Sequence, residues 1–316
     1  MEPADSAFGV GSLAVAEPVG AREVTVGMSR FSIRHETRYD YERPVGFGPH
    51  RLLVRPRDSH AIRIIAADLT LSPPGDTRWT LDAMANSVCH FTPQGEARSL
   101  SIVSDLIIER YPAPLDYFPV RDPRSAAPVD YDLSDRMVLA PFMAPATEDI
   151  QGLMPWLRSQ LGAPGEPAMA FLMRLTRVVH ENFEYLAREA EGVQSPAQTL
   201  NYRSGTCRDY AWLMVESLRH LGYAARFVTG YLYSASVAQV RGAGATHAWV
   251  QVFLPDLGWL EFDPTNGVAE SPDLIPIAVA RTPDEAAPIS GTVLGDPGFS
   301  TLSVHVDVRL EGAAAA

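Results

Sequence analysis

Apolar residues recur with two different spacings along this 316-residue chain, and the order of the two spacings limits its fold class. Strict alternation runs through residues 31–41 and returns over 302–310, as expected of strands with one buried face. Helical spacing characterises 150–161, 167–183 and 207–221. The pattern predicts an α+β protein that begins with an all-β sandwich. The remaining strands of this sandwich are expected near 51–55, 61–71, 87–92 and 100–109.

Length and proline content indicate how the chain is divided. A globular chain of this length, with 46% hydrophobic and 20% charged residues, is expected to form about two domains. The prolines at 112, 114, 119, 123 and 128 predict an extended connection. We expect a disordered tail over 1–28, a β-rich N-terminal domain with this connection over 29–135, and a second domain over 136–316.

Charge and cysteine content exclude several kinds of partner. The net charge of -12, without a dense cluster of Lys and Arg, argues against nucleic-acid binding. No stretch reaches about 18 consecutive apolar residues, so no membrane-spanning helix is predicted. The two cysteines, Cys89 and Cys207, lie far apart in the sequence, which favours a reducing compartment over a disulfide framework. With no signal-peptide pattern in residues 1–28, a cytoplasmic location is expected.

Cys207 is predicted to open a helix. Thr206, followed three residues later by Asp209, has the pattern of a capping box. A cysteine in the first turn lies near unpaired backbone N–H groups and the positive end of the helix dipole, both of which favour a thiolate. A lone cysteine at such a position is more often a small buried residue. The interpretation as a nucleophile therefore depends on finding a base elsewhere.

Two β-rich runs, 246–254 and 259–263, supply candidates for that base. They flank a turn-forming segment and predict a β-hairpin. His247 lies on one face of the first strand, and Asp263 lies on a face of the second. A four-residue loop would place these two side chains on opposite faces, whereas an odd-length loop or a bulge makes them neighbours. We predict the odd-length loop or the bulge.

Cysteine, histidine and aspartate in this order can carry out acyl transfer through a thioester. Cys207 attacks a carbonyl carbon, His247 takes the thiol proton and later protonates the leaving amine, and Asp263 fixes the imidazole tautomer. Asp263 and Pro264 also fit a simple strand end. Elsewhere, histidines 50, 180 and 220 are expected to cap, pack or face solvent.

Several segments resemble the bacterial transglutaminase-like family. They are GTCRDYA at 205–211, LGYAARFVTGY at 221–231, HAW at 247–249, and GW with FDPTNG at 258–267. A weaker resemblance, through YDYERPV at 39–45, HRLLVRPR at 50–57 and NSV at 86–88, extends to the β-domain that precedes the core in many members. The resemblance implies a papain-like transglutaminase core, with helices packed on an antiparallel sheet, and a Cys207, His247 and Asp263 triad. Gln251 departs from the family pattern, in which glutamate is usual.

The resemblance implies a cysteine-dependent amide hydrolase or acyltransferase that acts on a peptide or protein substrate. The alternative is a binding module in which the triad is vestigial. No cofactor and no metal are expected, because the acidic residues are scattered and Cys89 with His90 is too small a cluster for zinc.

The rest of the site is less constrained by the sequence. The backbone N–H of Cys207 can provide one oxyanion donor. The candidates for a second donor are Asn201, Tyr202 and Tyr185. The candidates for lining a substrate cleft are Trp249, Asp209 and Tyr231.

Overall fold

The structure of the protein is a computed structural model that describes residues 28–111, 129–147, 152–186, 192–234, 241, 244–255 and 257–313. Of the expected tail over 1–28, all but the last residue lies outside the described residues. The five prolines of the expected connection also lie outside them.

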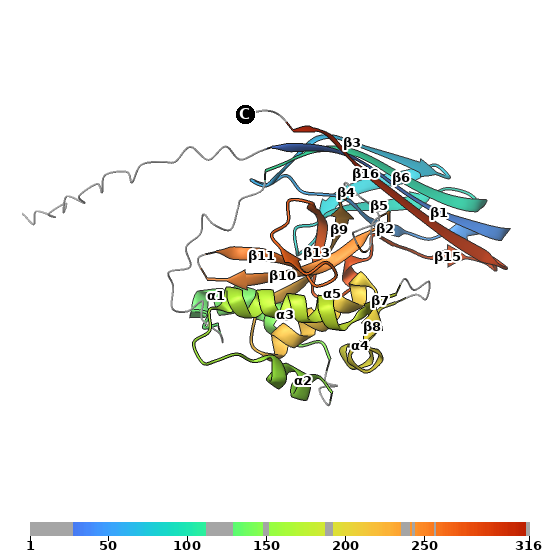
Figure 1. The fold of residues 1–316 in the computed structure, drawn as a ribbon. Helices are drawn as coiled ribbons and strands as arrows, with labels where there is room; N and C mark the ends of the chain where they lie inside the picture. Colours follow the sequence, from blue (N-terminus) through green and yellow to red (C-terminus); the bar gives the residue numbers. More distant parts are fainter. Residues whose placement is uncertain are drawn as a thin grey trace, which may run out of the picture.

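A sandwich of two antiparallel sheets forms the upper part of the molecule in Figure 1. One sheet has the order β15-β1-β6-β3, with β16 also paired to β1, and the other has the order β14-β2-β5-β4. Apolar side chains such as Tyr41, Leu52 and Phe91 are buried between them. The strands are β1 (Ser29–Phe47), β2 (His50–Arg55), β3 (Ile62–Ser72), β4 (Gly75–Leu81), β5 (Ser87–Pro93), β6 (Ala97–Arg110), β14 (Ile289–Ser290), β15 (Val293–Leu294) and β16 (Ser300–Ala313).

The last three strands return to this sandwich. β16 pairs with β1 from Ser29 to Tyr41, β15 pairs with the end of β1, and β14 pairs with β2. The sequence assigned 136–316 to one domain, whereas strand pairing places 289–313 in the sandwich. Alternation over 302–310 predicts a strand, but it cannot identify a partner that is distant in the sequence.

The remaining strands build a five-stranded antiparallel sheet of order β12-β11-β10-β9-β13. The helices lie on one side of this sheet and the sandwich lies on the other (Figure 1). The elements are α1 (Leu133–Met143), α2 (Leu153–Gln160), α3 (Ala168–Asn182), α4 (Pro196–Tyr202), α5 (Cys207–His220), a 3₁₀ turn (Asp284–Ala286), β9 (Ala225–Leu232), β10 (His247–Leu254), β11 (Gly258–Asp263), β12 (Val268–Ala269) and β13 (Leu274–Ala280). A separate parallel pair is formed by β7 (Glu184–Tyr185) and β8 (Ser204–Gly205).

Alternation along β10 divides its side chains between the two layers. Ala248, Val250 and Val252 pack in one cluster with Met214 and Leu218 of α5. Residues 247, 249 and 251 lie on the other face of the strand. The α+β class and the papain-like core preceded by a β-sandwich are thus confirmed. Among the described residues, no helix combines the length and the apolar content that crossing a membrane requires.

Candidate active site

Cys207 is the first residue of α5, and a buried carboxylate fixes the start of this helix. Oδ2 of Asp209 accepts hydrogen bonds from the backbone N–H and the hydroxyl of Thr206, at 2.8 and 3.0 Å. Its Oδ1 accepts the backbone N–H of Gln194 at 2.7 Å. The predicted helix start is confirmed. Cys207 therefore lies where backbone N–H groups have no acceptor within the helix.

Three residues join β10 to β11, so the predicted odd-length loop is confirmed. Leu254 pairs with Gly258, and Val250 pairs with Phe262. The next pair in this register is residue 249 with Asp263. Residue 249 is two positions after His247 in β10, so both point to the same face. The two side chains therefore share one face of the hairpin as diagonal neighbours.

His247 and Asp263 form a buried hydrogen-bonded pair. Nε2 of His247 lies 2.9 Å from Oδ2 of Asp263, and both side chains are fully buried. Burial raises the pKa of Asp263, but His247 and other hydrogen-bond donors outweigh this effect and hold the pKa below its ordinary value. Burial lowers the pKa of His247, but Asp263 and then Cys207 raise it to about 10. At neutral pH the pair is an imidazolium and a carboxylate.

Nδ1 is the imidazole nitrogen of His247 that remains available to Cys207, because Nε2 is hydrogen-bonded to Asp263. This Nδ1 atom is buried and forms no hydrogen bond with any residue that the structure describes. The Cys207 side chain is nonetheless close enough to contribute to the raised pKa of His247. The structure thus brings the three predicted residues together, with His247 between the thiol and the carboxylate.

Asn266 holds Asp263 from the turn that follows β11. Its Nδ2 donates to Oδ2 of Asp263 at 2.8 Å, and its Oδ1 accepts the backbone N–H of Arg241 at 3.1 Å. The N–H of Thr265 donates to the other carboxylate oxygen at 2.8 Å. Sequence reasoning did not assign a role to Asn266, because an asparagine after Asp-Pro-Thr also fits an ordinary turn.

Among the three candidates for the second oxyanion donor, Tyr185 lies beside the site. It pairs with Gly205, two residues before Cys207. Its pKa is raised to about 12, first by burial and then by the charges of Cys207 and Asp263, so the phenol is protonated at neutral pH and can donate. The other two candidates, Asn201 and Tyr202, are exposed on α4, and Tyr202 is 59% exposed.

The three candidates for a substrate cleft are buried, as Cys207, His247 and Asp263 are, and their place in a cleft stays a prediction. Trp249 is fully buried, and its ring stacks on that of His247 with centroids 5.9 Å apart. Tyr231 is buried with its hydroxyl 2.9 Å from Nδ1 of His35 in the sandwich. Asp209 is fully buried at the start of α5. Sequence patterns mark these positions, but they do not show that the sandwich and the α5 loop cover them.

His180 lies near the site and has structural partners. Its Nδ1 is 2.7 Å from the carbonyl oxygen of Thr265, and its ring packs against Gly267. Cys89 and Cys207 are both free thiols. Within the described part of the chain, no group of three or more His, Cys, Asp or Glu side chains could hold a metal ion.

Two family descriptions match successive parts of the chain. Residues 157–264 match the Transglutaminase-like superfamily, and residues 31–109 match the Bacterial transglutaminase-like N-terminal region. An uncharacterised protein of Mycobacterium tuberculosis is 28% identical over 294 residues, which cover 89% of this chain and 93% of that protein. A protein-glutamine gamma-glutamyltransferase of Pseudomonas aeruginosa is 36% identical over 115 residues, or 34% of this chain and 17% of that protein.

A solved structure has the same overall fold. It is that of a protein from Cytophaga hutchinsonii, provisionally assigned as a cysteine protease, and it superposes with a TM-score of 0.70 at 20% identity. The superposition covers 92% of this chain and 93% of the other. With a transglutaminase-like core behind the N-terminal β-domain of the bacterial proteins, this chain belongs to the bacterial transglutaminase-like family.

Proposed function

We propose that this protein is a cysteine enzyme that cleaves or transfers peptide or isopeptide amide bonds through a thioester on Cys207. The observation that carries the proposal is the buried pair of His247 and Asp263, with Cys207 next to the imidazole at the start of α5. A cation beside a cysteine at a helix N-terminus favours the nucleophilic thiolate. The transglutaminase-like core supports a cysteine enzyme in general terms.

In the first step, the sulfur of Cys207 forms a bond to the amide carbonyl carbon. The carbon–nitrogen bond then breaks, and the leaving amine takes the proton from Nδ1 of His247. In the second step, water or an amine gives a proton to His247 and attacks the thioester, which releases the Cys207 thiolate. Asp263 stays bonded to Nε2 throughout and stabilises the charged imidazole.

The carbonyl oxygen gains negative charge in both steps and requires hydrogen-bond donors. The backbone N–H of Cys207 provides one donor at the helix start. The hydroxyl of Tyr185 provides the second donor. This phenol remains protonated at neutral pH, and it lies close enough to Cys207 for the charge of Cys207 to raise its pKa. A preorganised donor of this kind stabilises the tetrahedral intermediate more than the substrate carbonyl.

Alkylation by iodoacetamide tests the nucleophile. Cys89 serves as an internal control, because it is buried in the sandwich and burial raises its pKa. We expect Cys207 to be alkylated much faster than Cys89 at pH 7, as measured by peptide mass spectrometry. Equal rates at the two cysteines would argue that Cys207 is an ordinary thiol.

Turnover is tested with the wild-type protein and the Cys207→Ala variant. Each is incubated with a cellular peptide pool and a primary-amine probe, and the products are identified by mass spectrometry. New free carboxylates that depend on Cys207 indicate hydrolysis, and probe-labelled peptides indicate transfer. If the wild type and Cys207→Ala give the same products, the proposal fails and the vestigial binding module is favoured.

A further inference from the structure

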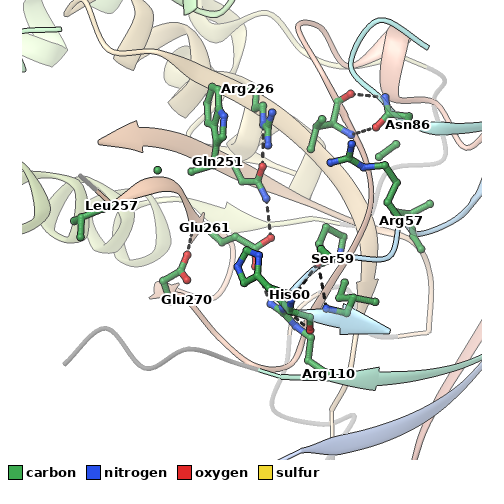
Figure 2. Close-up of a pocket in the computed structure, with 18 residues that line it drawn as sticks. Arg57, Ser59, His60, Asn86, Arg110, Arg226, Gln251, Leu257, Glu261 and Glu270 are labelled. Atoms are coloured by element: carbon green, nitrogen blue, oxygen red, sulfur yellow. Dashed lines mark hydrogen bonds and ion pairs between the residues drawn. The ribbon is translucent and has the colours of Figure 1, made fainter. Parts of the chain in front are cut away.

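A cavity of about 400 Å³ lies between the sandwich and the five-stranded sheet. Figure 2 shows its lining, to which the sandwich contributes Arg57 and Arg110 and the sheet contributes Arg226, Gln251 and Glu261. The volume is within the range of small-molecule sites. The lining does not include Cys207, His247 or Asp263.

Trp249 separates this cavity from the proposed catalytic residues. His247, Trp249 and Gln251 follow one another on one face of β10, but only Gln251 lines the cavity. The Trp249 ring stacks on His247, and its Nε1 donates to Oε1 of Glu261 at 3.3 Å. Because Trp249 is fully buried, the cavity is a second site and not an extension of the first.

A row of hydrogen bonds forms one wall of the cavity. Nε of Arg226 donates to Oε1 of Gln251 at 2.8 Å, and Nε2 of Gln251 donates to Oε1 of Glu261 at 3.0 Å. Arg110 reaches the other carboxylate oxygen of Glu261 at 3.4 Å. Glu261 therefore offsets the charge of Arg110, while the direct partner of Arg226 is a neutral amide.

Arg226 and Arg57 line the same cavity, and among the described residues no ion pair neutralises their positive charges. The Arg226 guanidinium stacks on the ring of Trp259, with its central carbon 3.9 Å from the centroid, and forms no ion pair within 4.0 Å among the described residues. Arg57 is exposed and also forms no ion pair among them. Burial, and then the charge of Arg57, lower the pKa of Arg226 to about 9. In Figure 2 the Arg57 side chain points from the opposite wall toward the region that holds Arg226.

We propose that this cavity binds a small organic carboxylate between Arg57 and Arg226. With Nε of Arg226 bonded to Gln251, the terminal guanidinium nitrogens remain for the two oxygens of a carboxylate. Apolar lining residues, Leu257 and Ile277 among them, contact the rest of the ligand. The carboxyl groups of Glu261 and Glu270 line the same cavity, and burial raises the pKa of both, to about 7 for Glu270. Above that pH their negative charge favours a singly charged carboxylate over a phosphate dianion.

Benzoate is a suitable probe, with benzamide as its neutral isostere and inorganic phosphate as the competing anion. Binding to the full chain is measured by calorimetry or by saturation-transfer NMR. We expect benzoate to bind and benzamide and phosphate not to bind. Arg57→Gln should weaken benzoate binding about tenfold or more, because a charge-assisted hydrogen bond is lost. Arg78→Gln is the matched control, since Arg78 is an exposed arginine of β4 outside the cavity.

The Cys207→Ala variant distinguishes this proposal from the proposed function, because it should bind benzoate as the wild type does. Three results would overturn the carboxylate site. They are no benzoate binding, equal affinity for benzamide or phosphate, and the same loss of affinity in Arg57→Gln and Arg78→Gln.

Discussion

His247 and Asp263 meet across the β10–β11 hairpin, with 2.9 Å between Nε2 and Oδ2. The three-residue loop sets this relationship, because it pairs Leu254 with Gly258. Shifting the register by one residue would turn Asp263 to the opposite face of the sheet, where α5 packs. The length of a short turn thus decides whether the imidazole has a carboxylate partner.

Asp263→Asn is expected to reduce stability most between about pH 4 and 6.5. The folded pKa of Asp263 lies below the ordinary 3.8, so its contribution is present above that pH and is lost as the pH falls. The folded pKa of His247 is raised from 6.5 to about 10, so its contribution is complete below pH 6.5 and is lost as the pH rises toward 10. Breaking such a buried pair costs on the order of 3 kcal/mol.

Melting temperatures of the wild type and Asp263→Asn, measured from pH 4 to 9, check this prediction. The difference should be largest below pH 6.5 and should shrink toward pH 9. Asp284→Asn is the matched control, because Asp284 is an exposed residue of the 3₁₀ turn and should show no such trend. A difference for Asp263→Asn that is constant with pH would mean that the charge pair does not form.

Asn266→Ala is expected to slow both turnover and the alkylation of Cys207. Asp263 loses a 2.8 Å hydrogen bond that orients it toward His247. Because hydrogen bonds to charged groups contribute about 1.5–3 kcal/mol, kcat should fall roughly tenfold to a hundredfold, with little change in KM. Asn182→Ala, at the exposed end of α3, should leave both rates unchanged. A rise in KM alone would contradict a positioning role.

Tyr185→Phe is expected to slow turnover without slowing alkylation. The variant removes one hydroxyl, and loss of an oxyanion donor typically lowers kcat about a hundredfold. Alkylation by iodoacetamide passes through no oxyanion, so its rate at Cys207 should stay the same. Tyr202→Phe, on the exposed face of α4, is the control and should change neither rate. If alkylation falls together with turnover, Tyr185 acts on the thiol and not on the carbonyl oxygen.

The sequence predicted the elements whose buried face is regular. In α3, for example, Phe171, Leu172, Leu175 and Val179 are buried at helical spacing. α1 was not predicted, because its apolar residues Leu133, Met137 and Val138 are exposed and produce no such pattern. α4 is too short to show a period, and β4 is exposed along most of its length. Local caps start α1 and α4, and pairing with β5 holds β4 in place.

For the site, the sequence indicated the reacting groups but not the groups around them. Cys207, His247 and Asp263 have residue types and local settings that are typical of one chemistry. Asn266 lies in a turn whose sequence has no distinctive feature, so its hydrogen bond to Asp263 was not predicted. The row of hydrogen bonds from Arg226 through Gln251 to Glu261 depends on which face of β10 the sandwich covers. The hydrogen bonds of this row join residues 10 and 25 positions apart and leave no local signal.

Truncation after residue 299 is expected to destabilise the whole protein. β16 pairs with β1 from Ser29 to Tyr41, and its Val306 is buried with Ile275 and Ile277 where the sandwich meets the sheet. Without β16, β1 exposes unpaired N–H and C=O groups along one edge. The melting temperature should fall by more than about 10 °C, or the protein should aggregate. Truncation after residue 313 is the control and should leave the melting temperature unchanged. An unchanged melting temperature after truncation at 299 would instead favour a sandwich complete within 29–135.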